Sequence, residues 1–320
     1  MLRKSHSGSA MAAIPLGLKW KRTKAKLWSD RYIYLMILPV IIYFVILKYW
    51  PMGWLSISFY DYKILKGFSG SEFVGLEHFI SFFTNSDFLK LLFNTLIINV
   101  YAMMFVFPMP IIFAVLLNEL GFKHLKKFTQ TVSYLPYFIS TVAFAALIMN
   151  FLSPSSGILA GIFQSLGMDP IYYLGDPKYF RTILVLSGIW QGTGWNAIVY
   201  LSALTGIDQG LYEAAEIDGA NRLQRIWHIT LPGISTTIII LLILQIGNLL
   251  TTNFEKIYLL QNTANLQVSE VLQTYVYKRG LVQSNYSYAT AVGLFNSIVS
   301  VVLVAFSNKL SRKFSETSLW

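Results

Sequence analysis

The stretch that decides the fold is residues 211–232, which read Leu-Tyr-Glu-Ala-Ala-Glu-Ile-Asp-Gly-Ala-Asn-Arg-Leu-Gln-Arg-Ile-Trp-His-Ile-Thr-Leu-Pro. It is polar and rich in residues that favour helices, and a long apolar stretch lies on each side of it. Apolar stretches of that kind are typical of helices in a lipid bilayer. We therefore expect the polar residues between them at a membrane surface, where another protein can bind them.

The composition of the whole chain is typical of a membrane protein. Of its 320 residues, 55% are hydrophobic and only 12% are charged, which is too apolar for an ordinary soluble domain. The 23 Phe, 19 Tyr and 8 Trp are enough to form aromatic belts at the two membrane interfaces. The absence of cysteine excludes disulfide frameworks and thiolate metal sites.

Six apolar segments without charged residues run along the chain, and a helix needs about 20 residues to cross the hydrocarbon core. The first has only 16 residues, but Lys48 beside it can extend its ammonium group to the interface. We expect an all-α membrane protein with six transmembrane helices in one domain, residues 32–307. The segments are Tyr32–Leu47, Asn94–Leu117, Tyr134–Leu152, Thr182–Leu204, Ile234–Asn253 and Tyr288–Ser307.

The basic residues predict the orientation of these helices. Segments 1–31, 118–133, 205–233 and 308–320 lie on one side of the membrane and hold 16 of the 25 Lys and Arg residues. By the positive-inside rule this side is the cytoplasm, so both termini are expected there. The net charge of +10 then reflects topology and contact with anionic lipid rather than nucleic-acid binding.

The two ends of the chain carry short segments outside the membrane domain. Residues 1–31 mix cations with two tryptophans between Lys19 and Trp28, which predicts an interfacial helix, with a disordered basic tail as the alternative. No small-residue cleavage site follows the first apolar segment, so we interpret it as an uncleaved span rather than a signal peptide. Residues 308–320 form a cytoplasmic tail.

The loop of residues 205–233, called the polar loop below, divides into two short helices. Asp208 can cap the first, and Gly219 suits the left-handed residue that ends a helix. Asn221 can cap the second, with Gln224 three positions later as in a capping box. Pro232 then closes the loop before the fifth apolar segment.

One face of the first of these helices is small and carries a charge. Ala214 and Ala215 would let another protein approach the backbone closely, and Glu213 beside them offers a carboxylate to a basic partner. The alternative is a solvated helix–turn–helix that merely joins two spans.

The spacing within this loop is similar to the motif of one family, the membrane-spanning permease subunits of binding-protein-dependent ABC importers. That resemblance implies the type I importer permease fold, in which the loop carries a cytoplasmic coupling helix. The matching residues are Glu213-Ala214-Ala215, then Gly219 after three residues, and Ile229-x-Leu231-Pro232 after nine more.

The resemblance also implies a role for each marked residue at a cleft of a cytoplasmic ATPase subunit. Glu213 would pair with a basic residue of the ATPase, and Ala214 and Ala215 would permit close packing. Gly219 would make the turn, which Asp218 would steady. The implied partners are two ATPase subunits, a second homologous permease and an extracytoplasmic binding protein.

The chain itself lacks the means to use ATP or to hold a metal. It contains no Gly-x4-Gly-Lys-Ser/Thr loop, so ATP and Mg would be bound by the partner ATPases and no cofactor is expected in this chain. Its four histidines lie in different segments without ligand spacing, so no metal site is expected. The outward loops are too short for a ligand-binding domain, and a soluble receptor would be a separate polypeptide.

A second resemblance covers residues 30 to 310 and points to permeases that import oligosaccharides from polysaccharide breakdown, including sugars that contain uronates. It implies a maltose-type permease in the plasma membrane of a bacterium. The segments that carry it are Tyr49–Gly53, Phe73–Phe79, Phe107–Pro110, Leu117–Glu119 and Gln130–Pro136.

A sugar that crosses the membrane needs hydrogen-bond partners and flat apolar faces, so polar and aromatic residues within the spans are the candidates for its pathway. Gly194 could let the fourth span bend, so that both of its tryptophans face the substrate. The alternative is that these residues serve helix packing. The candidates are Trp190, Gln191 and Trp195 in the fourth span and Gln245 and Asn248 in the fifth.

Two other classes of protein fit the sequence less well. A membrane-embedded enzyme acting on lipid-linked sugars would need acidic clusters near the membrane, and all six apolar segments lack carboxylates. A channel or receptor subunit would leave the polar loop without a role. We therefore expect a transport subunit with no catalytic residues.

Overall fold

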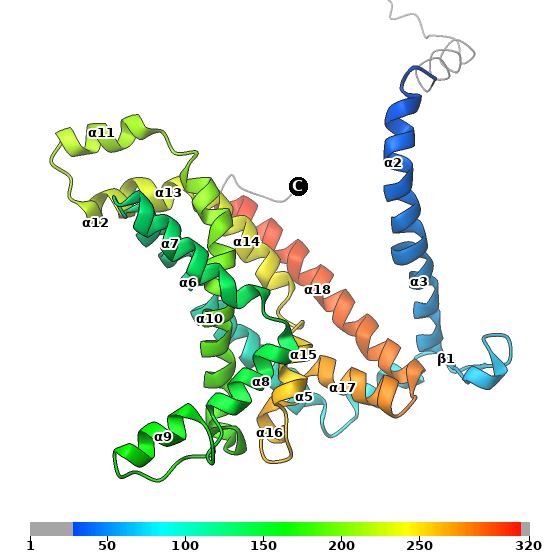
Figure 1. Cartoon of the computed structure of the whole chain (residues 1–320). Helices are drawn as coiled ribbons and strands as arrows, with labels where there is room; N and C mark the ends of the chain where they lie inside the picture. Colours follow the sequence, from blue (N-terminus) through cyan, green and yellow to red (C-terminus); the bar gives the residue numbers. More distant parts are fainter. Residues whose placement is uncertain (1–27, 315–320) are drawn as a thin grey trace, which may run out of the picture. The chain divides into compact units, whose positions relative to one another are not determined.

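The computed structural model of the chain describes residues 28–314, most of which are helical (Figure 1). The described residues divide into two compact units, residues 28–56 and 57–314. The predicted interfacial helix at Lys19–Trp28 lies almost wholly outside the described residues, and so does the end of the predicted tail.

The first unit contains helix α2 (Arg31–Phe44), a π-helical turn (Val45–Tyr49) and the short α3 (Trp50–Met52). No residue of α2 is buried, although nearly all of its side chains are apolar. Apolar side chains all around a helix are unfavourable in water. We therefore expect the surface of α2 to contact lipid or another membrane protein. This agrees with the predicted first span.

The second unit contains most of the helices and one small sheet. Strands β1 (Tyr60–Asp61) and β2 (Glu72–Phe73) pair antiparallel, with Tyr60 opposite Phe73. The α-helices are α4 (Glu77–Phe83), α5 (Phe88–Tyr101), α6 (Pro108–Asn118), α7 (Lys123–Tyr134), α8 (Thr141–Phe151), α9 (Ile158–Ser165), α10 (Pro177–Leu204), α11 (Gln209–Ile217), α12 (Arg222–Arg225), α13 (Leu231–Gly233), α14 (Ser235–Gly247), α15 (Phe254–Leu260), α16 (Leu266–Ser269), α17 (Leu272–Tyr277) and α18 (Tyr286–Phe314). The 3-10 helices are Gly53–Phe59 (which begins in the first unit), Ile64–Lys66, Leu135–Phe138 and Tyr173–Gly175, and further π-helical turns cover Ala102–Val106, Ile226–Thr230 and Lys278–Val282.

Three helices in residues 28–314 are long and apolar enough to cross a membrane by themselves: Arg31–Phe59, Phe88–Asn118 and Tyr286–Lys313. Two helix pairs qualify only together and are bent, by 98° between Phe138 and Thr141 and by 61° between Gly233 and Ser235. Helix α10 has 28 residues and is about 42 Å long, enough to span, but its polar residues lower its hydropathy. Together these make the six expected crossings.

The helices differ from the predicted spans at several boundaries. The first continues to Phe59 rather than Leu47, and the second begins at Phe88 rather than Asn94. The third begins at Lys123 rather than Tyr134, because α7 is amphipathic and its polar side chains hide it from a search for apolar runs. The fifth ends as a helix at Gly247, and residues 248–253 continue as a turn and an extended segment. A Cβ atom on Gly247 would lie 2.1 Å from the Val304 side chain, so α14 ends where it presses against α18.

Helix α10 lies at the centre of the second unit, against α5, α6, α7, α14 and α16. Its contact with α7 is especially close, because a Cβ atom on Gly194 would lie 2.1 Å from the Ser133 carbonyl oxygen. The polar loop lies at one end of α10, and α9 and α16 lie at the other (Figure 1). The carboxyl end of α18 lies at the polar-loop end. This arrangement agrees with the predicted alternation of loops.

Candidate functional site

The polar loop folds into a hairpin of α11 and α12, as predicted from its local signals. The Asp208 side chain accepts a hydrogen bond from the Gly210 backbone at 2.9 Å and caps α11. Gly219 has a φ of +77°, a conformation that costs other residues about 1–2 kcal/mol. The capping box is present, with Asn221 and Gln224 bonded to each other's backbone N–H at 2.8 and 2.9 Å.

Within the hairpin, which the structure describes in full, the side-chain bonds do not involve the side chains of the predicted coupling residues. The Tyr212 hydroxyl lies 2.9 Å from the buried Thr230 hydroxyl, and Arg225 forms an ion pair with Glu216 at 3.1 Å. Neither Glu213 nor Asp218 has an ion-pair partner among residues 28–314. The turn is closed by backbone bonds, including one of 2.9 Å from Ala220 N–H to the Ala215 carbonyl, and not by the Asp218 side chain.

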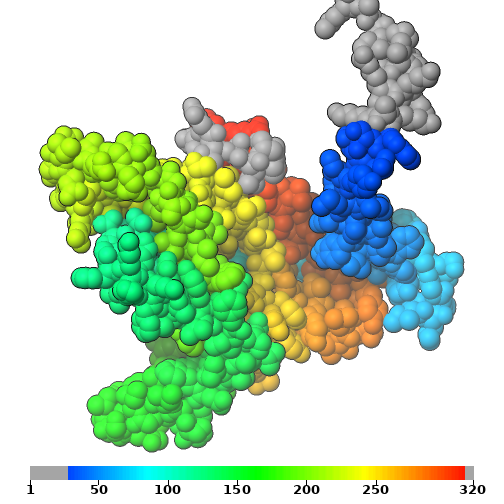
Figure 2. All heavy atoms as spheres, turned by 45° about the horizontal axis from the view of Figure 1, so that its top comes forward, coloured from blue at the N-terminus to red at the C-terminus, as the bar shows by residue number. Residues whose placement is uncertain are grey.

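The surface of the hairpin is apolar as well as charged. Ile217 is 87% exposed, and Leu223, Trp227 and Leu211 are also exposed. The hairpin is the yellow-green segment in Figure 2. Glu213 and Ala214 are exposed, while Ala215 is half-buried in a shallow recess beside Gly219. A rigid hairpin with uncovered large apolar groups beside free carboxylates is suited to binding another protein. The four exposed apolar groups are Leu211, Ile217, Leu223 and Trp227.

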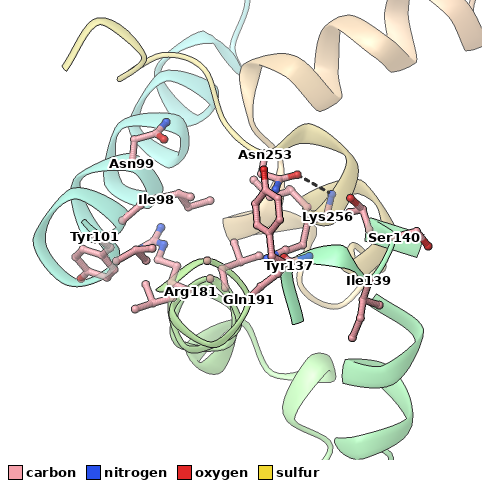
Figure 3. A pocket seen from close by; sticks show the side chains of 18 of the residues that line it. Ile98, Asn99, Tyr101, Tyr137, Ile139, Ser140, Arg181, Gln191, Asn253 and Lys256 are labelled. Carbon is pink, nitrogen blue, oxygen red and sulfur yellow. Dashed lines mark hydrogen bonds between the residues drawn. The ribbon is translucent and has the colours of Figure 1, made fainter. Parts of the chain in front are cut away.

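The second candidate is a cavity of about 580 Å³, which is within the usual size range for small-molecule sites. Helices α5, α10 and α15 and the segment between α7 and α8 contribute its walls (Figure 3). Its polar lining is supplied by side chains from all of these elements. They are Asn99, Ser140, Thr141, Arg181, Gln191, Asn253 and Lys256.

Two cations belong to this lining, and we call the space the cation cavity. Lys256 is 5% exposed, and its ammonium group lies 4.8 Å from the centre of the Phe144 ring. Burial lowers the pKa of Lys256 from 10.5 to about 8. Arg181 donates to the Asn94 side-chain oxygen at 3.1 Å, while its buried Nε has no partner.

Asn94 fixes the position of Arg181. Its side-chain nitrogen donates to the backbone carbonyls of Gln267 and Glu270 at 2.9 and 3.1 Å, which leaves its oxygen directed at the guanidinium group. Asn94 is 5% exposed, so these bonds are shielded from water. Helix α5, helix α10 and the turn between α16 and α17 are thereby joined at one side chain.

The predicted pathway residues are divided among several places. Gln191 lines the cation cavity, while Gln245 and Asn248 line a neighbouring cavity of about 280 Å³. The two cavities share Ala102 and Val106 as wall residues, so they adjoin.

The two tryptophans of α10 do not face one space, contrary to expectation. Trp190 stacks on Phe144 at 5.2 Å between ring centres and lines a separate apolar cavity with Leu147. Trp195 stacks on Tyr137 at 4.8 Å, with the rings nearly parallel at 7°. Helix α10 continues unbroken through Gly194, and side chains five residues apart on such a helix point about 140° apart.

Arg181 and Lys256 were not among the site residues predicted from the sequence. Arg181 lies one residue before the fourth apolar segment, and Lys256 lies three residues after the fifth. A cation at such a position is expected to mark the membrane interface. Only the packing of α15 against α8 buries Lys256 and turns it toward the cavity. No local signal in the sequence distinguishes this arrangement from an exposed loop lysine.

Comparisons with known proteins agree on one class. The family model described as "binding-protein-dependent transport system inner membrane component" matches residues 106–316. The polygalacturonan/rhamnogalacturonan transport system permease protein YteP of Bacillus subtilis (strain 168) is 45% identical over 302 residues, 94% of each chain. Protein LplB of the same strain is 42% identical over 304 residues, 95% of each chain.

A solved structure is similar over nearly the whole chain. It is the crystal structure of a bacterial alginate ABC transporter in complex with an alginate pentasaccharide-bound periplasmic protein. One of its chains matches with a TM-score of 0.84 and 40% sequence identity, over 92% of this chain and 99% of that one. The architecture described above is thus that of an experimentally determined transporter subunit.

Proposed function

We propose a substrate class and a set of partners for this chain, which belongs to the family of binding-protein-dependent transport system inner membrane components. It is a membrane permease of an ABC importer with the type I permease fold, as expected from the sequence. Its relatives are transport subunits and not enzymes, and nothing in them supports the alternative of an enzyme for lipid-linked sugars.

The proposed substrates are oligosaccharides released from polysaccharides, including chains with uronate units. The names of the relatives support this class, since they refer to polygalacturonan, rhamnogalacturonan and alginate. The cation cavity and its neighbour supply the amide and aromatic groups that sugar hydroxyls and C–H faces require. We propose Gln191, Gln245 and Asn248 as pathway residues in these walls, and Trp195 as the support of Tyr137.

The proposed partners are a second homologous permease, two cytoplasmic ATPase subunits and an extracytoplasmic binding protein. ATP and Mg would be bound by the ATPases. The observation that carries this proposal is the rigid hairpin of α11 and α12, whose Glu213 is exposed and free of any ion pair in the described chain. Movement of the ATPases against this hairpin would switch the permease between inward-open and outward-open states.

We further propose that both termini and the polar loop lie in the cytoplasm of a bacterium. The distribution of Lys and Arg supports this orientation. The carboxyl end of α18 lies at the same end of α10 as the polar loop, which is consistent with it (Figure 1).

The test is capture of the ATPase and measurement of uptake. A tagged chain purified from bacterial membranes should bring down a second permease and an ATPase, and cross-linkers placed beside Ala214 should reach the ATPase. A deletion strain carrying the gene should take up uronate oligosaccharides from a panel of neutral and acidic sugars. Failure of the cross-linker to capture any ATPase in intact cells would reject the proposed coupling role.

A further inference from the structure

The cation cavity contains positive charge that the protein does not neutralise. Arg181 and Lys256 both line it, and none of its lining residues is an aspartate or glutamate. Neither cation has a carboxylate within 4.0 Å among residues 28–314, where all ion pairs involve other cations. Figure 3 shows the two side chains reaching the cavity from different helices.

Burying an unpaired charge is costly, so such a group is retained only where something compensates it. For Lys256 the protein supplies the Phe144 ring, which provides part of the compensation that a carboxylate would give. For Arg181 it supplies one amide oxygen and leaves Nε without any acceptor. The Lys256 ammonium group and the terminal guanidinium nitrogens of Arg181 therefore keep N–H donors for an anion from outside the chain, whereas Nε is enclosed by the protein.

The rest of the cavity wall fits a sugar better than a small inorganic anion. Tyr137 presents an aromatic ring that Trp195 holds in place at 4.8 Å, and Phe138 lies next to it in the same wall. Aromatic faces of this kind cover the C–H surface of a pyranose ring. Gln191 and Asn253 add amide groups that can bond to hydroxyls.

We propose that Arg181 and Lys256 are the specificity-determining residues for carboxylated sugars, binding the uronate groups of an oligosaccharide as it passes through the cavity. This inference rests on the proposed function and names the residues that would select an acidic substrate over a neutral one. The guanidinium group can bind a carboxylate through two parallel N–H donors, and the ammonium group acts as a point charge.

The experiment compares an acidic sugar with its uncharged form in the complete importer. Initial uptake of tri-galacturonate and of its methyl ester is measured at saturating binding protein for the wild type, Arg181→Gln and Lys256→Gln. The ester removes charge and leaves the sugar rings unchanged. Lys178→Gln is the matched control, because Lys178 is an exposed cation one turn from Arg181 and outside the cavity.

Each cavity variant should lower uptake of the acid about tenfold and leave uptake of the ester at its wild-type level, since a hydrogen bond to a charged group typically contributes that factor. Lys256→Arg should keep most of the activity, and Lys178→Gln should match the wild type. Unchanged uptake of the acid in both cavity variants would overturn the inference. Equal losses of acid and ester at normal membrane levels would also overturn it.

A different result is expected if the proposed substrate class is wrong. In that case the wild-type importer takes up neither sugar. Equilibrium binding of labelled tri-galacturonate to the purified full chain then tests the cation pair directly, with binding that both variants weaken as the supporting result. Absence of binding to the wild-type chain would reject the pair as a carboxylate site. Equally strong binding of a sugar phosphate would reject the assigned ligand class.

Discussion

The polar loop and the cation cavity differ in how far apart in the sequence their parts lie. The hairpin of α11 and α12 is built from about 25 consecutive residues, and its caps, turn and internal bonds are all local. The cation cavity draws residues from Ile98 to Ile257, and they are supplied by α5, α10, α15 and the segment between α7 and α8. The first region can therefore be disrupted by one backbone change, while the second depends on several packing contacts.

The largest effect is expected for Gly219→Pro in the turn of the hairpin. Proline fixes φ near −65° and has no N–H, whereas Gly219 has a φ of +77° and donates to the Glu216 carbonyl at 3.1 Å. Uptake should fall to background while the protein remains in the membrane, as measured by transport and immunoblotting. Gly161→Ala, on α9 with open space around it, is the control. Normal uptake by well-expressed Gly219→Pro would refute the coupling role.

Charge reversal on the hairpin comes next. Glu213→Arg should leave the fold intact, because Glu213 is exposed and forms no ion pair in the described chain, but it should prevent docking of a basic ATPase surface. Co-purification of the ATPase should be lost and uptake abolished. Glu216→Gln breaks only the exposed ion pair with Arg225 and should retain both. Retention of the ATPase by Glu213→Arg would contradict the assigned pairing.

In the cavity region, single changes should reduce transport without preventing assembly. Trp195→Ala removes the ring that stacks on Tyr137, and Gln245→Leu removes an amide from the neighbouring cavity. Each should reduce uptake about tenfold while ATPase co-purification persists. If both variants show unchanged transport kinetics, these residues do not belong to the pathway.

A change in the helix packing behind the cavity should lower stability and affect transport less than changes in the lining. Gly194→Ala places a methyl group against the Ser133 carbonyl, so α7 and α10 must separate, at a cost of about 1–3 kcal/mol. Thermal unfolding in detergent should show a lower Tm and transport should drop a few-fold. Gly192→Ala, which meets only the movable Asn196 side chain at 3.1 Å, is the control. Equal Tm values for the two variants would show that the close contact is unimportant.

The smallest effect is expected from pH. Raising the pH from 7 to 9 takes Lys256 through its pKa of about 8, so uptake of acidic sugars should fall a few-fold and that of the methyl ester should not. In Lys256→Arg the profile should be flatter, because arginine keeps its charge over this range. A wild-type profile equal to that of Lys256→Arg would remove Lys256 from the site.

Unfolding does not explain such a decline. The pKa of Lys256 is lower in the folded protein than its ordinary value of 10.5, so the unfolded chain binds more protons between about pH 8 and 10.5. This group therefore makes the fold more stable as pH rises. The other titratable groups around it are Arg181, Tyr101 and Tyr137 in the cavity and Glu255 and Tyr258 on α15. Helix α8 has none, and α17 has only tyrosines.

The local structure of the polar loop could be predicted from the sequence. Caps and turns depend on residues within four positions of each other, so Asp208, Gly219 and Asn221 could be assigned correctly. The all-α class and the family followed from apolar runs and a long motif. The amphipathic α7 was assigned to a loop, because its polar side chains interrupt any apolar run and none of its residues is buried.

The cavity could be predicted only in part. Gln191 and Gln245 are polar residues in apolar runs, which makes them visible in a sequence. Arg181 and Lys256 lie at the ends of such runs, where cations are common. The burial of Lys256 depends on α15, and the position of the half-buried Arg181 depends on Asn94, which is anchored next to α17. The directions of the two tryptophan side chains of α10 could not be predicted, because they depend on the helix staying regular through Gly194.

Asn94 has a consequence for the electrostatics of the whole cavity. Aspartate has the same shape and could pair with Arg181, but it would cancel the charge of the guanidinium group and could not donate to the Gln267 and Glu270 carbonyls. The amide orients that group and contributes no charge of its own, with its nitrogen anchored to the Gln267 and Glu270 carbonyls. The Asn94 side chain thus fixes the position of the guanidinium group without neutralising its charge. Exchange of a single nitrogen for oxygen, as in Asn94→Asp, would convert an anion-attracting surface into a closed internal ion pair.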